Sequence, residues 1–244
     1  MEFKEHEIKW NDEKVKRFWD FYNNYSAFED HWFSKVFGTA IIKFAGKYVD
    51  WKGKVLDYGI GKGHLATHML PNKKVELRAA DFSSETVNNI NTQFGGMDNF
   101  KGCVLVQGFP SPFQENEFDV VMLIEAIEHL TDDYLMPTLK EMYRILKPGG
   151  KIVITTVNNE NLKSRNVMCP DCGCIFHRVQ HVRAFTAQSL DALTKSFGFK
   201  MVFSGASNFH EYAKYGLFHK SINFLKKNMG TAYVAPHLVY IGSK

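Results

Sequence analysis

The sequence contains few cysteines, no long hydrophobic run and no block of like charge. Four cysteines in 244 residues do not amount to a disulfide framework. No apolar run approaches the ~18 residues of a membrane-spanning helix, and residues 1–12 are charged and lack the apolar centre of a signal peptide. No internal repeat or low-complexity tract is present. We therefore expect a cytoplasmic protein without a membrane span.

The composition is that of an ordinary globular domain. With 45% hydrophobic and 14% aromatic residues, the chain is long enough to bury a sizeable core and short enough to be one domain with additions. The 30 basic and 26 acidic residues give a net charge of +4 and are spread along the chain. This balance neither requires nor excludes a nucleic-acid partner.

Strand-like and helix-like segments alternate along the middle of the chain. Short apolar runs at 54–57, 75–81, 104–107, 118–124 and 151–156 predict strands, and segments of helical character follow most of them. Such alternation predicts a parallel sheet with right-handed crossovers. A helix near 189–197 and two final strands at 199–203 and 238–241 complete the pattern. The fold class is therefore α/β, with a doubly wound, seven-stranded and mostly parallel sheet.

Three segments fall outside this alternation. Apolar and aromatic residues at helical spacing predict helices at 9–25 and 32–49, so residues 1–52 are interpreted as a helical cap over an active site or sheet edge. Residues 53–244 then form the main domain. It carries a polar insertion at about 158–181, interpreted as an active-site loop, and a second insertion at about 204–236.

The first strand leads into a glycine-rich turn, Asp57-Tyr-Gly59-Ile-Gly61-Lys-Gly63. Alternating glycines let the backbone pass close beneath a ligand without interference from a Cβ atom. Asp81 ends the next strand, where doubly wound folds place a carboxylate against ribose hydroxyls. The turn departs from the G-x-G-x-x-G of dinucleotide folds, and Asp57 suits an ammonium group. The spacing therefore favours S-adenosylmethionine (SAM) over NAD.

These motifs resemble class I SAM-dependent methyltransferases, in particular the broad group that includes ubiquinone-biosynthesis O-methyltransferases. The resemblance runs from about residue 54 to 200 and rests on VLDYGIGKG at 55–63, ADFS at 80–83, FDVV at 118–121 and LKPGG at 146–150. It implies that residues 53–244 are a SAM-binding methyltransferase domain. The cofactor-binding residues that it implies are Asp57, Gly59, Gly61, Gly63, Asp81, Phe82, Gly108, Phe109 and Ile124.

The resemblance assigns parts of the cofactor to particular residues. Asp57 and the three glycines would hold the methionine part, and Asp81 the ribose. The family usually has an acid where this chain has Phe109, and that acid bonds the adenine amine. A phenyl ring cannot accept such a bond, so the resemblance does not specify how the adenine is held.

Acidic and histidine residues follow the fourth strand in Glu125-Ala-Ile-Glu128-His129. On a helix, these spacings of three and four would bring the side chains to one face. Two carboxylates and an imidazole could bind Mg²⁺, Mn²⁺ or another divalent ion. In the alternative interpretation, Glu128 caps a helix and His129 is a packed core residue.

A second resemblance, to small-RNA 3′-terminal 2′-O-methyltransferases, favours the metal. Those enzymes bind a metal through E-x-x-E-H, followed by a Thr-Pro-Asn-type strand end and a later histidine before an aromatic-Thr pair. This chain has Glu125, Glu128 and His129, then TTVN at 155–158 with valine in place of proline, then His181 before Phe-Thr. The resemblance implies His181 as the fourth ligand. Without a metal, His129 or His181 is the candidate general base, and Glu125, His129 and His181 are the candidate catalytic residues.

The remaining chemistry-bearing motif is CPDCGCIFH at 169–177. Its Cys-x-x-Cys knuckle suits zinc, and Cys169, Cys172, Cys174 and His177 could form a tetrahedral site. The thiols could instead be unbound and reduced, or form a redox-labile pair. Because His181 cannot serve two metals, we assign it to the glutamates. Loops of similar sequence occur in methyltransferases of bacterial surface-sugar clusters.

Several functions fit these motifs. The leading hypothesis is an O-methyltransferase for a small hydroxylated metabolite such as a sugar, a nucleotide-linked sugar or polysaccharide precursor, or a phosphate-bearing compound. An RNA 2′-O-methyltransferase fits the metal motif but lacks a concentrated basic stripe. Three further hypotheses are a quinone-precursor O-methyltransferase, a catalytically silent SAM-binding module and an NAD-dependent oxidoreductase, and the turn spacing disfavours the last. The sequence does not predict the oligomeric state.

Overall fold

A computed structural model of the chain describes residues 3–212, 221 and 235–244. Its main sheet has seven strands in the order β4-β3-β2-β5-β6-β10-β9. The strands are β2 (Gly53–Tyr58), β3 (Val75–Asp81), β4 (Phe100–Leu105), β5 (Phe118–Ile124), β6 (Leu146–Val157), β9 (Lys200–Ser207) and β10 (His237–Ser243). Within this sheet β10 runs antiparallel to both of its neighbours, and the other paired strands are parallel. The predicted seven-stranded, mostly parallel α/β fold is confirmed.

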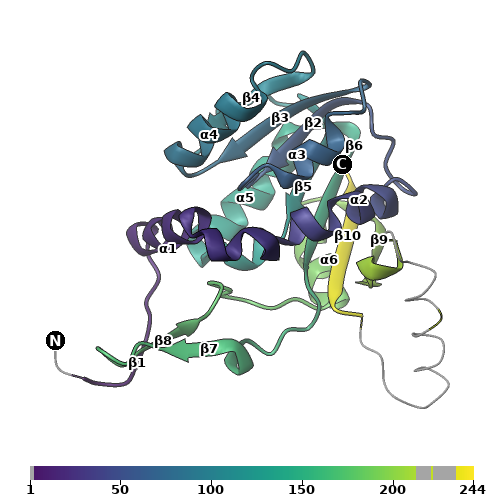
Figure 1. Ribbon diagram of the computed structural model, residues 1–244. Coiled ribbons are helices and arrows are strands. Elements are labelled where there is room, and N and C mark those ends of the chain that lie inside the picture. Colours follow the sequence, from purple (N-terminus) through teal and green to yellow (C-terminus); the bar gives the residue numbers. More distant parts are fainter. Residues whose placement is uncertain (1–2, 213–220, 222–234) are drawn as a thin grey trace.

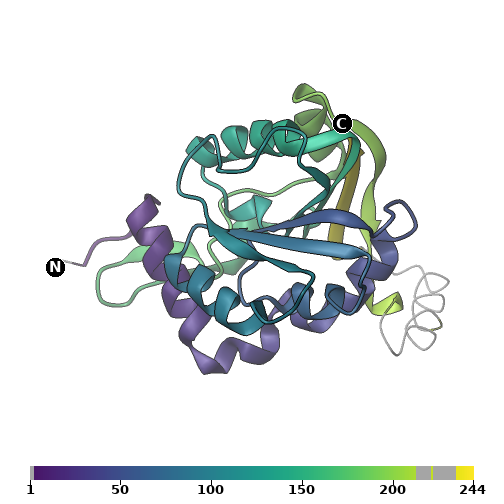
Figure 2. The ribbon, with the colours of Figure 1, turned by 90° about the horizontal axis from the view of Figure 1, so that it is seen from above.

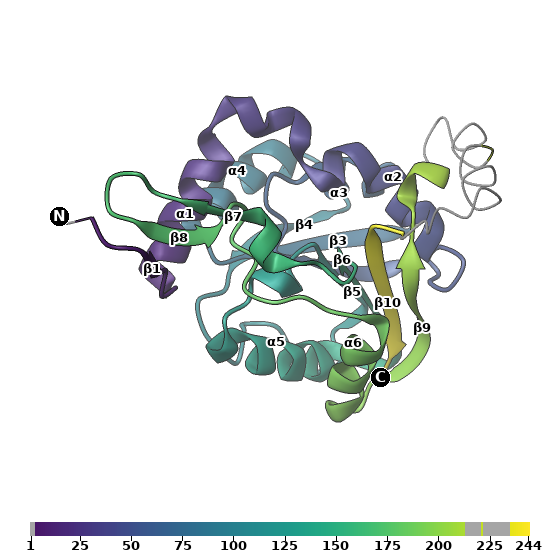
Figure 3. The same ribbon diagram turned by 90° about the horizontal axis from the view of Figure 1, so that it is seen from below.

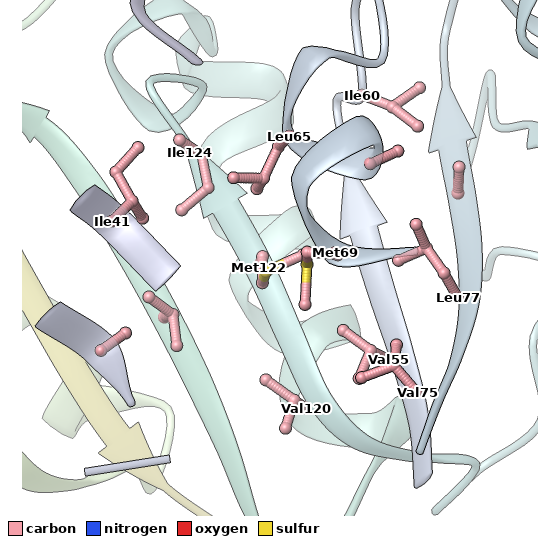
Figure 4. Packing of buried hydrophobic residues seen from close by; sticks show 14 of the residues in the cluster. Ile41, Val55, Ile60, Leu65, Met69, Val75, Leu77, Val120, Met122 and Ile124 are labelled. Atoms are coloured by element: carbon pink, nitrogen blue, oxygen red, sulfur yellow. The ribbon is translucent and has the colours of Figure 1, made fainter. Parts of the chain in front are cut away.

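Helices cover both faces of this sheet (Figure 2). On one face lie α2 (Phe33–Ala45), α3 (His64–Met69) and α4 (Ser84–Phe94), and on the other lie α5 (Asp132–Ile145) and α6 (Ala187–Ser196). Each face has its own hydrophobic core. Figure 4 shows Leu65 and Met69 of α3 pointing toward Val55, Met122 and Ile124 of the central strands. The two cores hold the carboxyl ends of β2, β3 and β5 at one edge, where the candidate site lies.

Local sequence explains most element boundaries. The central strands are continuous apolar runs because both of their faces are buried, and β3 and β5 have the predicted bounds. The α4 helix begins where Ser83 accepts a hydrogen bond from the Thr86 amide. Two strands differ most from the pattern: β6 is predicted at 151–156 but spans Leu146–Val157, and β4 is predicted at 104–107 but spans Phe100–Leu105. Pairing with β3, which joins Leu77 to Phe100 and Ala79 to Cys103, sets its position, and Gly102 obscures the pattern.

The N-terminal segment contains β1 (His6–Glu7), α1 (Asp12–Asn24), a 3₁₀ turn (Ser26–His31) and α2. Both predicted helices are present with shorter bounds. The side chain of Asn11 caps α1 by accepting from the Lys14 amide. The two helices differ in packing, because α2 buries Phe37 and Ile41 in the core of the sheet whereas α1 has no buried residue. The α1 helix lies across the open edge of the domain (Figure 1).

The polar insertion at 158–181 has structure of its own. It contains a 3₁₀ turn (Leu162–Arg165), β7 (Asn166–Met168) and β8 (Cys174–His177). With β1 these strands form a second, three-stranded sheet in the order β1-β8-β7. The β7–β8 hairpin lies beside α1 (Figures 1 and 3), where the rings of Trp10 and Phe176 meet with centroids 6.4 Å apart.

Most of the second predicted insertion, at 204–236, lies outside the described residues. Its described part comprises the end of β9, a 3₁₀ turn at Phe209–Glu211 and residues 235–236. Phe209 is buried beneath α2, and its ring lies near those of Phe33 and Phe37. None of the helices in the described ranges is long and apolar enough to cross a membrane.

Candidate active site

The glycine turn and Asp81 meet at the carboxyl ends of β2 and β3. Asp81 accepts hydrogen bonds from the backbone amides of Gly61, at 3.2 Å, and Ser83, at 3.0 Å. Gly59 and Gly61 have φ angles of 82° and 53°, which favour glycine. Burial raises the pKa of Asp81 to about 6, although the two backbone donors act in the opposite direction. The turn is thus shaped around this carboxyl group.

Two other predicted cofactor residues have a packing role in the structure. Gly63 has a φ of 74°, and a Cβ atom there would lie 2.6 Å from the ring of Phe94 and 2.7 Å from Ile90. This glycine therefore allows α3 and α4 to approach each other closely. Asp57 is 3% exposed, and burial together with the charge of Asp81 raises its pKa to about 7. It lies beneath the turn and does not line the cavity described next.

A cavity of about 600 Å³ opens above the glycine turn. The predicted cofactor residues that line it are Gly59, Gly61, Asp81, Phe82 and Ile124. Gly108 and Phe109 do not line it; their neighbours Val106 and Gln107 do. The Phe109 ring instead faces Tyr134, with centroids 6.4 Å apart. The cavity continues from the glycine turn to the carboxyl end of β5, so both predicted halves of the site share one space.

The acidic segment after β5 is not the α-helix that its spacing suggested. Glu125 adopts a left-handed conformation with φ of 48°, and Ile127–His129 form a 3₁₀ turn. The change of direction at Glu125 removes the one-face geometry expected of Glu125, Glu128 and His129. Ligand atoms of Glu128, His129 and His181 lie within 4.8 Å of one another, and Glu125 is not part of this group. Three of the four predicted metal ligands are thus brought together.

A second group of candidate ligands contains Glu160, which no sequence motif identifies. Glu160, His177 and His181 also have ligand atoms within 4.8 Å of one another. Glu160 is the third residue after the end of β6, the neighbour of β5, so its place near the carboxyl ends of these strands could have indicated it as a site residue. His181 belongs to both groups: its Nδ1 is hydrogen-bonded to Glu160, and its Nε2 lies 4.0 Å from Oε1 of Glu128.

Burial controls the ionisation of both groups. It raises the pKa of Glu128 well above the usual range, with the Glu125 charge adding to the effect, and raises that of Glu125 to about 7. It lowers the pKa of His129 to about 3 and that of His177 to about 4, and it also lowers that of His181. The imidazoles are therefore neutral at pH 7.

These residues fit a divalent cation. Both carboxyl oxygens of Glu128 are buried without a hydrogen-bond partner, which is costly unless a cation or a ligand donor meets them. Neutral imidazoles beside a carboxylate are the ligands that Mn²⁺, Fe²⁺, Co²⁺ and Zn²⁺ accept, whereas Mg²⁺ prefers oxygen alone. The Glu128, His129 and His181 group therefore suits a first-row transition metal better than Mg²⁺.

The predicted zinc set is not assembled. His177 belongs to the group with Glu160 and His181, and none of the close ligand groups among the described residues includes a cysteine. The reason lies in β8, where side chains alternate between the two faces. Cys174 and His177 are three residues apart and therefore point to opposite faces of the strand. The structure does not bring Cys169, Cys172, Cys174 and His177 into one ligand group, and zinc binding by this set stays a prediction.

Gln180 joins the insertion to the N-terminal helix beside His129, at the end of the cavity that Glu128, His129 and His181 line. Its side chain accepts a hydrogen bond from Nε1 of Trp19 at 2.8 Å and donates to the carbonyl of His129 at 3.0 Å. The ring of Trp19 also contacts that of His129, with centroids 4.8 Å apart. Gln180 is fully buried and has a φ of 59°. Neither Trp19 nor Gln180 was a predicted site residue.

Comparison with known proteins gives the family. A family model described as "Methyltransferase domain" matches residues 30–203. The ubiquinone/menaquinone biosynthesis C-methyltransferase of Geotalea daltonii is 30% identical over 141 residues, which cover 56% of this chain and 57% of that protein. The demethylmenaquinone methyltransferase of Staphylococcus aureus strain MRSA252 is 30% identical over 152 residues, covering 62% and 60%. This chain thus matches somewhat more than half the length of these relatives.

The fold has counterparts among solved structures. The 1,6-didemethyltoxoflavin-N1-methyltransferase of Burkholderia thailandensis, solved with 1,6-didemethyltoxoflavin and S-adenosylhomocysteine bound, has a TM-score of 0.64 at 16% identity. That match covers 97% of this chain and 93% of the other. The chain belongs to the methyltransferase domain family and has the class I SAM-dependent methyltransferase fold. The predicted resemblance to that class is confirmed.

Proposed function

We propose that this protein transfers a methyl group from SAM to a hydroxyl of a small metabolite. The observation that supports the proposal most directly is the shared cavity: Gly61 and Asp81 line one part of it, and Glu128, His129 and His181 line another. A methyl donor and a group able to accept a proton would therefore face each other in one cavity. Direct transfer then needs positioning and the removal of one proton.

The cofactor end would hold SAM by shape and by one carboxylate. Gly59 and Gly61 leave room for the methionine part, and Asp81 is the acceptor for ribose hydroxyls, as the fold class suggests. SAM supplies an electrophilic methyl group when it is bound. Gly108 and Phe109 do not line the cavity, so Val106 and Gln107, which do, would contact the adenine.

The acceptor end would activate the hydroxyl. Glu128, His129 and His181 would hold a divalent ion, which lowers the pKa of a hydroxyl bound to it. The neutral imidazole of His181 is also able to accept the proton itself, because its pKa is lowered by burial and it carries no proton on one nitrogen at pH 7. The same three residues serve either route.

The acceptor class is proposed from the residues that line the cavity. Lys16 and Lys62 line it, paired with Asp20 and Glu29 respectively, and could meet a phosphate or another anionic substituent. The charge of the chain is balanced and dispersed, which favours a small molecule over RNA. A sugar, a nucleotide-linked sugar or a phosphate-bearing polysaccharide precursor fits these features, and the cytoplasm is the compartment in which such precursors meet SAM.

Methylation of a quinone precursor is the second candidate. The aromatic rings of Trp19, Tyr22 and Trp32 line the cavity and could stack on a flat acceptor. The two relatives from Geotalea and Staphylococcus are named for menaquinone or ubiquinone biosynthesis. The two candidates differ in the bond formed, which is oxygen to carbon in one and carbon to carbon in the other.

One set of measurements separates the possibilities. S-adenosylhomocysteine binding is measured by calorimetry, and the purified protein is then incubated with isotopically labelled SAM and hydroxylated or quinol acceptors, with and without chelation. An O-methyl product detected by NMR supports the leading proposal, and a C-methyl product supports the second candidate. Binding without transfer to any acceptor would indicate a silent SAM-binding module, and absence of binding would contradict the cofactor assignment.

A further inference from the structure

The side chain of Glu160 lies against His181 in the interior of the insertion. One of its carboxylate oxygens, Oε2, accepts a hydrogen bond from Nδ1 of His181. The two side chains are 4% and 7% exposed, so water does not compete for this contact. A carboxylate accepts and does not donate, so the ring proton of neutral His181 is on Nδ1. The lone pair is then on Nε2, the atom 4.0 Å from Glu128.

The other oxygen of Glu160 faces donors as well. Nε2 of His177 and Nε of Arg165 each lie 3.5 Å from Oε1. The Nδ1 atom of His177 accepts the backbone amide of His181 at 3.1 Å and that of Val179 at 3.4 Å. A neutral imidazole that accepts at Nδ1 carries its proton on Nε2, so His177 presents an N–H toward Glu160. Neither contact is a hydrogen bond, so Oε1 is buried beside two N–H groups without a hydrogen-bond partner, whereas Oε2 is bonded to His181.

We propose that Glu160 is a positioning residue that fixes the tautomer of His181 and thereby aims the Nε2 lone pair at Glu128 and the cavity. Arg165 and His177 place N–H groups 3.5 Å from its other oxygen. The proposal rests on the proposed function in one respect, because a free Nε2 is useful at an acceptor site. A carboxylate behind a ligating or proton-accepting histidine fixes its orientation and raises its basicity.

This arrangement also decides between the two candidate ligand groups. His177 cannot offer a lone pair from Nε2 while its Nδ1 accepts two backbone amides. A cation therefore belongs with Glu128, His129 and His181, and Glu160 supports that group from behind. The same reasoning applies to His129. Its Nδ1 lies 3.4 Å from the carbonyl of Gln180, which can only accept, so the proton is on Nδ1 and the lone pair is on Nε2.

The tautomer is tested directly by ¹⁵N NMR of protein labelled at histidine. The His181 signals are assigned by their loss in His181→Ala. We expect a protonated Nδ1 and an unprotonated Nε2 in the wild type. In Glu160→Gln we expect the amide oxygen to face the N–H groups of Arg165 and His177. The amide NH₂ then faces Nδ1 of His181, and the ring proton of His181 moves to Nε2. A wild-type protein with the proton on Nε2, or an unchanged tautomer in Glu160→Gln, would overturn the proposal.

A second measurement uses Mn²⁺ binding by calorimetry, since thiolates of the cysteine loop compete little for this ion. Glu160→Gln is expected to bind Mn²⁺ roughly 10- to 100-fold more weakly, the effect of losing such a supporting carboxylate. Glu160→Asp, which keeps the charge, should recover part of that loss. His177→Gln should change affinity by at most a few-fold. Complete loss of binding in His177→Gln would place the ion in the other group and overturn the proposal.

The two readouts separate this inference from the proposed function. If the tautomer and Mn²⁺ affinity respond as expected while no acceptor is methylated, the positioning role stands and the reaction is wrong. If methyl transfer occurs but neither readout responds to Glu160→Gln, the reaction stands and the role of Glu160 is wrong. Circular dichroism of each variant verifies that the fold is retained.

Discussion

The two ends of the cavity are built in different ways. The cofactor end consists of strand ends and a tight turn, where backbone amides of Gly61 and Ser83 hold one carboxylate, Asp81. The acceptor end consists of side chains from distant segments, where Trp19, His129 and His181 come from the N-terminal helix, the turn after β5 and the insertion. The first is built on the strands of the main sheet, and the second draws on segments outside that sheet. Substitutions should therefore separate cofactor binding from turnover.

The largest expected effect is on turnover. Glu128→Gln removes the carboxylate from the group with His129 and His181, and methyl transfer should fall about 100-fold or more, as for loss of a group acting in the transition state. S-adenosylhomocysteine affinity should stay within about twofold, because Asp81 is untouched. Glu76→Gln, an exposed glutamate on β3, is the matched control. Wild-type turnover in Glu128→Gln would show that this end of the cavity has no catalytic role.

The second-largest expected effect is on cofactor binding. Asp81→Ala leaves the amides of Gly61 and Ser83 and any bound ribose without their acceptor, so cofactor affinity should fall about 100-fold, or roughly 3 kcal/mol. Calorimetry with S-adenosylhomocysteine measures it. The exposed Asp98 provides the control variant Asp98→Ala. Unchanged affinity would remove Asp81 from the site.

A smaller effect is expected where the two segments of the acceptor end are joined. Trp19→Phe keeps an aromatic ring but removes the hydrogen bond to Gln180, worth about 1 kcal/mol. We expect the KM for the acceptor to rise about fivefold with little change in cofactor affinity. Trp10→Phe, whose indole packs against Phe18 and Phe176, serves as the comparison. If Trp10→Phe had the same effect, general packing would explain both results.

The smallest effect concerns the cysteines. The three thiols lie on the β7–β8 hairpin, and no close ligand group among the described residues contains one. Serine at positions 169, 172 and 174 together should leave turnover and the thermal unfolding midpoint unchanged. A zinc ion in the purified wild type that disappears with this substitution, together with a lower midpoint, would restore the structural-zinc hypothesis.

The difference between the two ends also explains what could be predicted. The glycine turn, Asp81 and the alternation of strands and helices are local or repetitive features, and short motifs specify them. The expected helix through Glu125 and His129 was wrong because the left-handed Glu125 ends the strand, a change of direction that the spacing of three and four does not reveal. Glu160 was missed because it matches no motif and gains its role from His181, 21 residues further along.

By itself, the sequence determined the α/β fold, the position of the cofactor turn and the presence of an acidic and histidine-rich acceptor site. Hydrophobic periodicity and glycine placement are patterns that span a few residues, so they can be recognised in the sequence without a structure. The tertiary structure decided which histidines share a carboxylate and which of the candidate ligands lie close together. Those properties depend on distances of a few ångströms between segments far apart in the chain, and burial sets the charge of each group only once these segments have packed together.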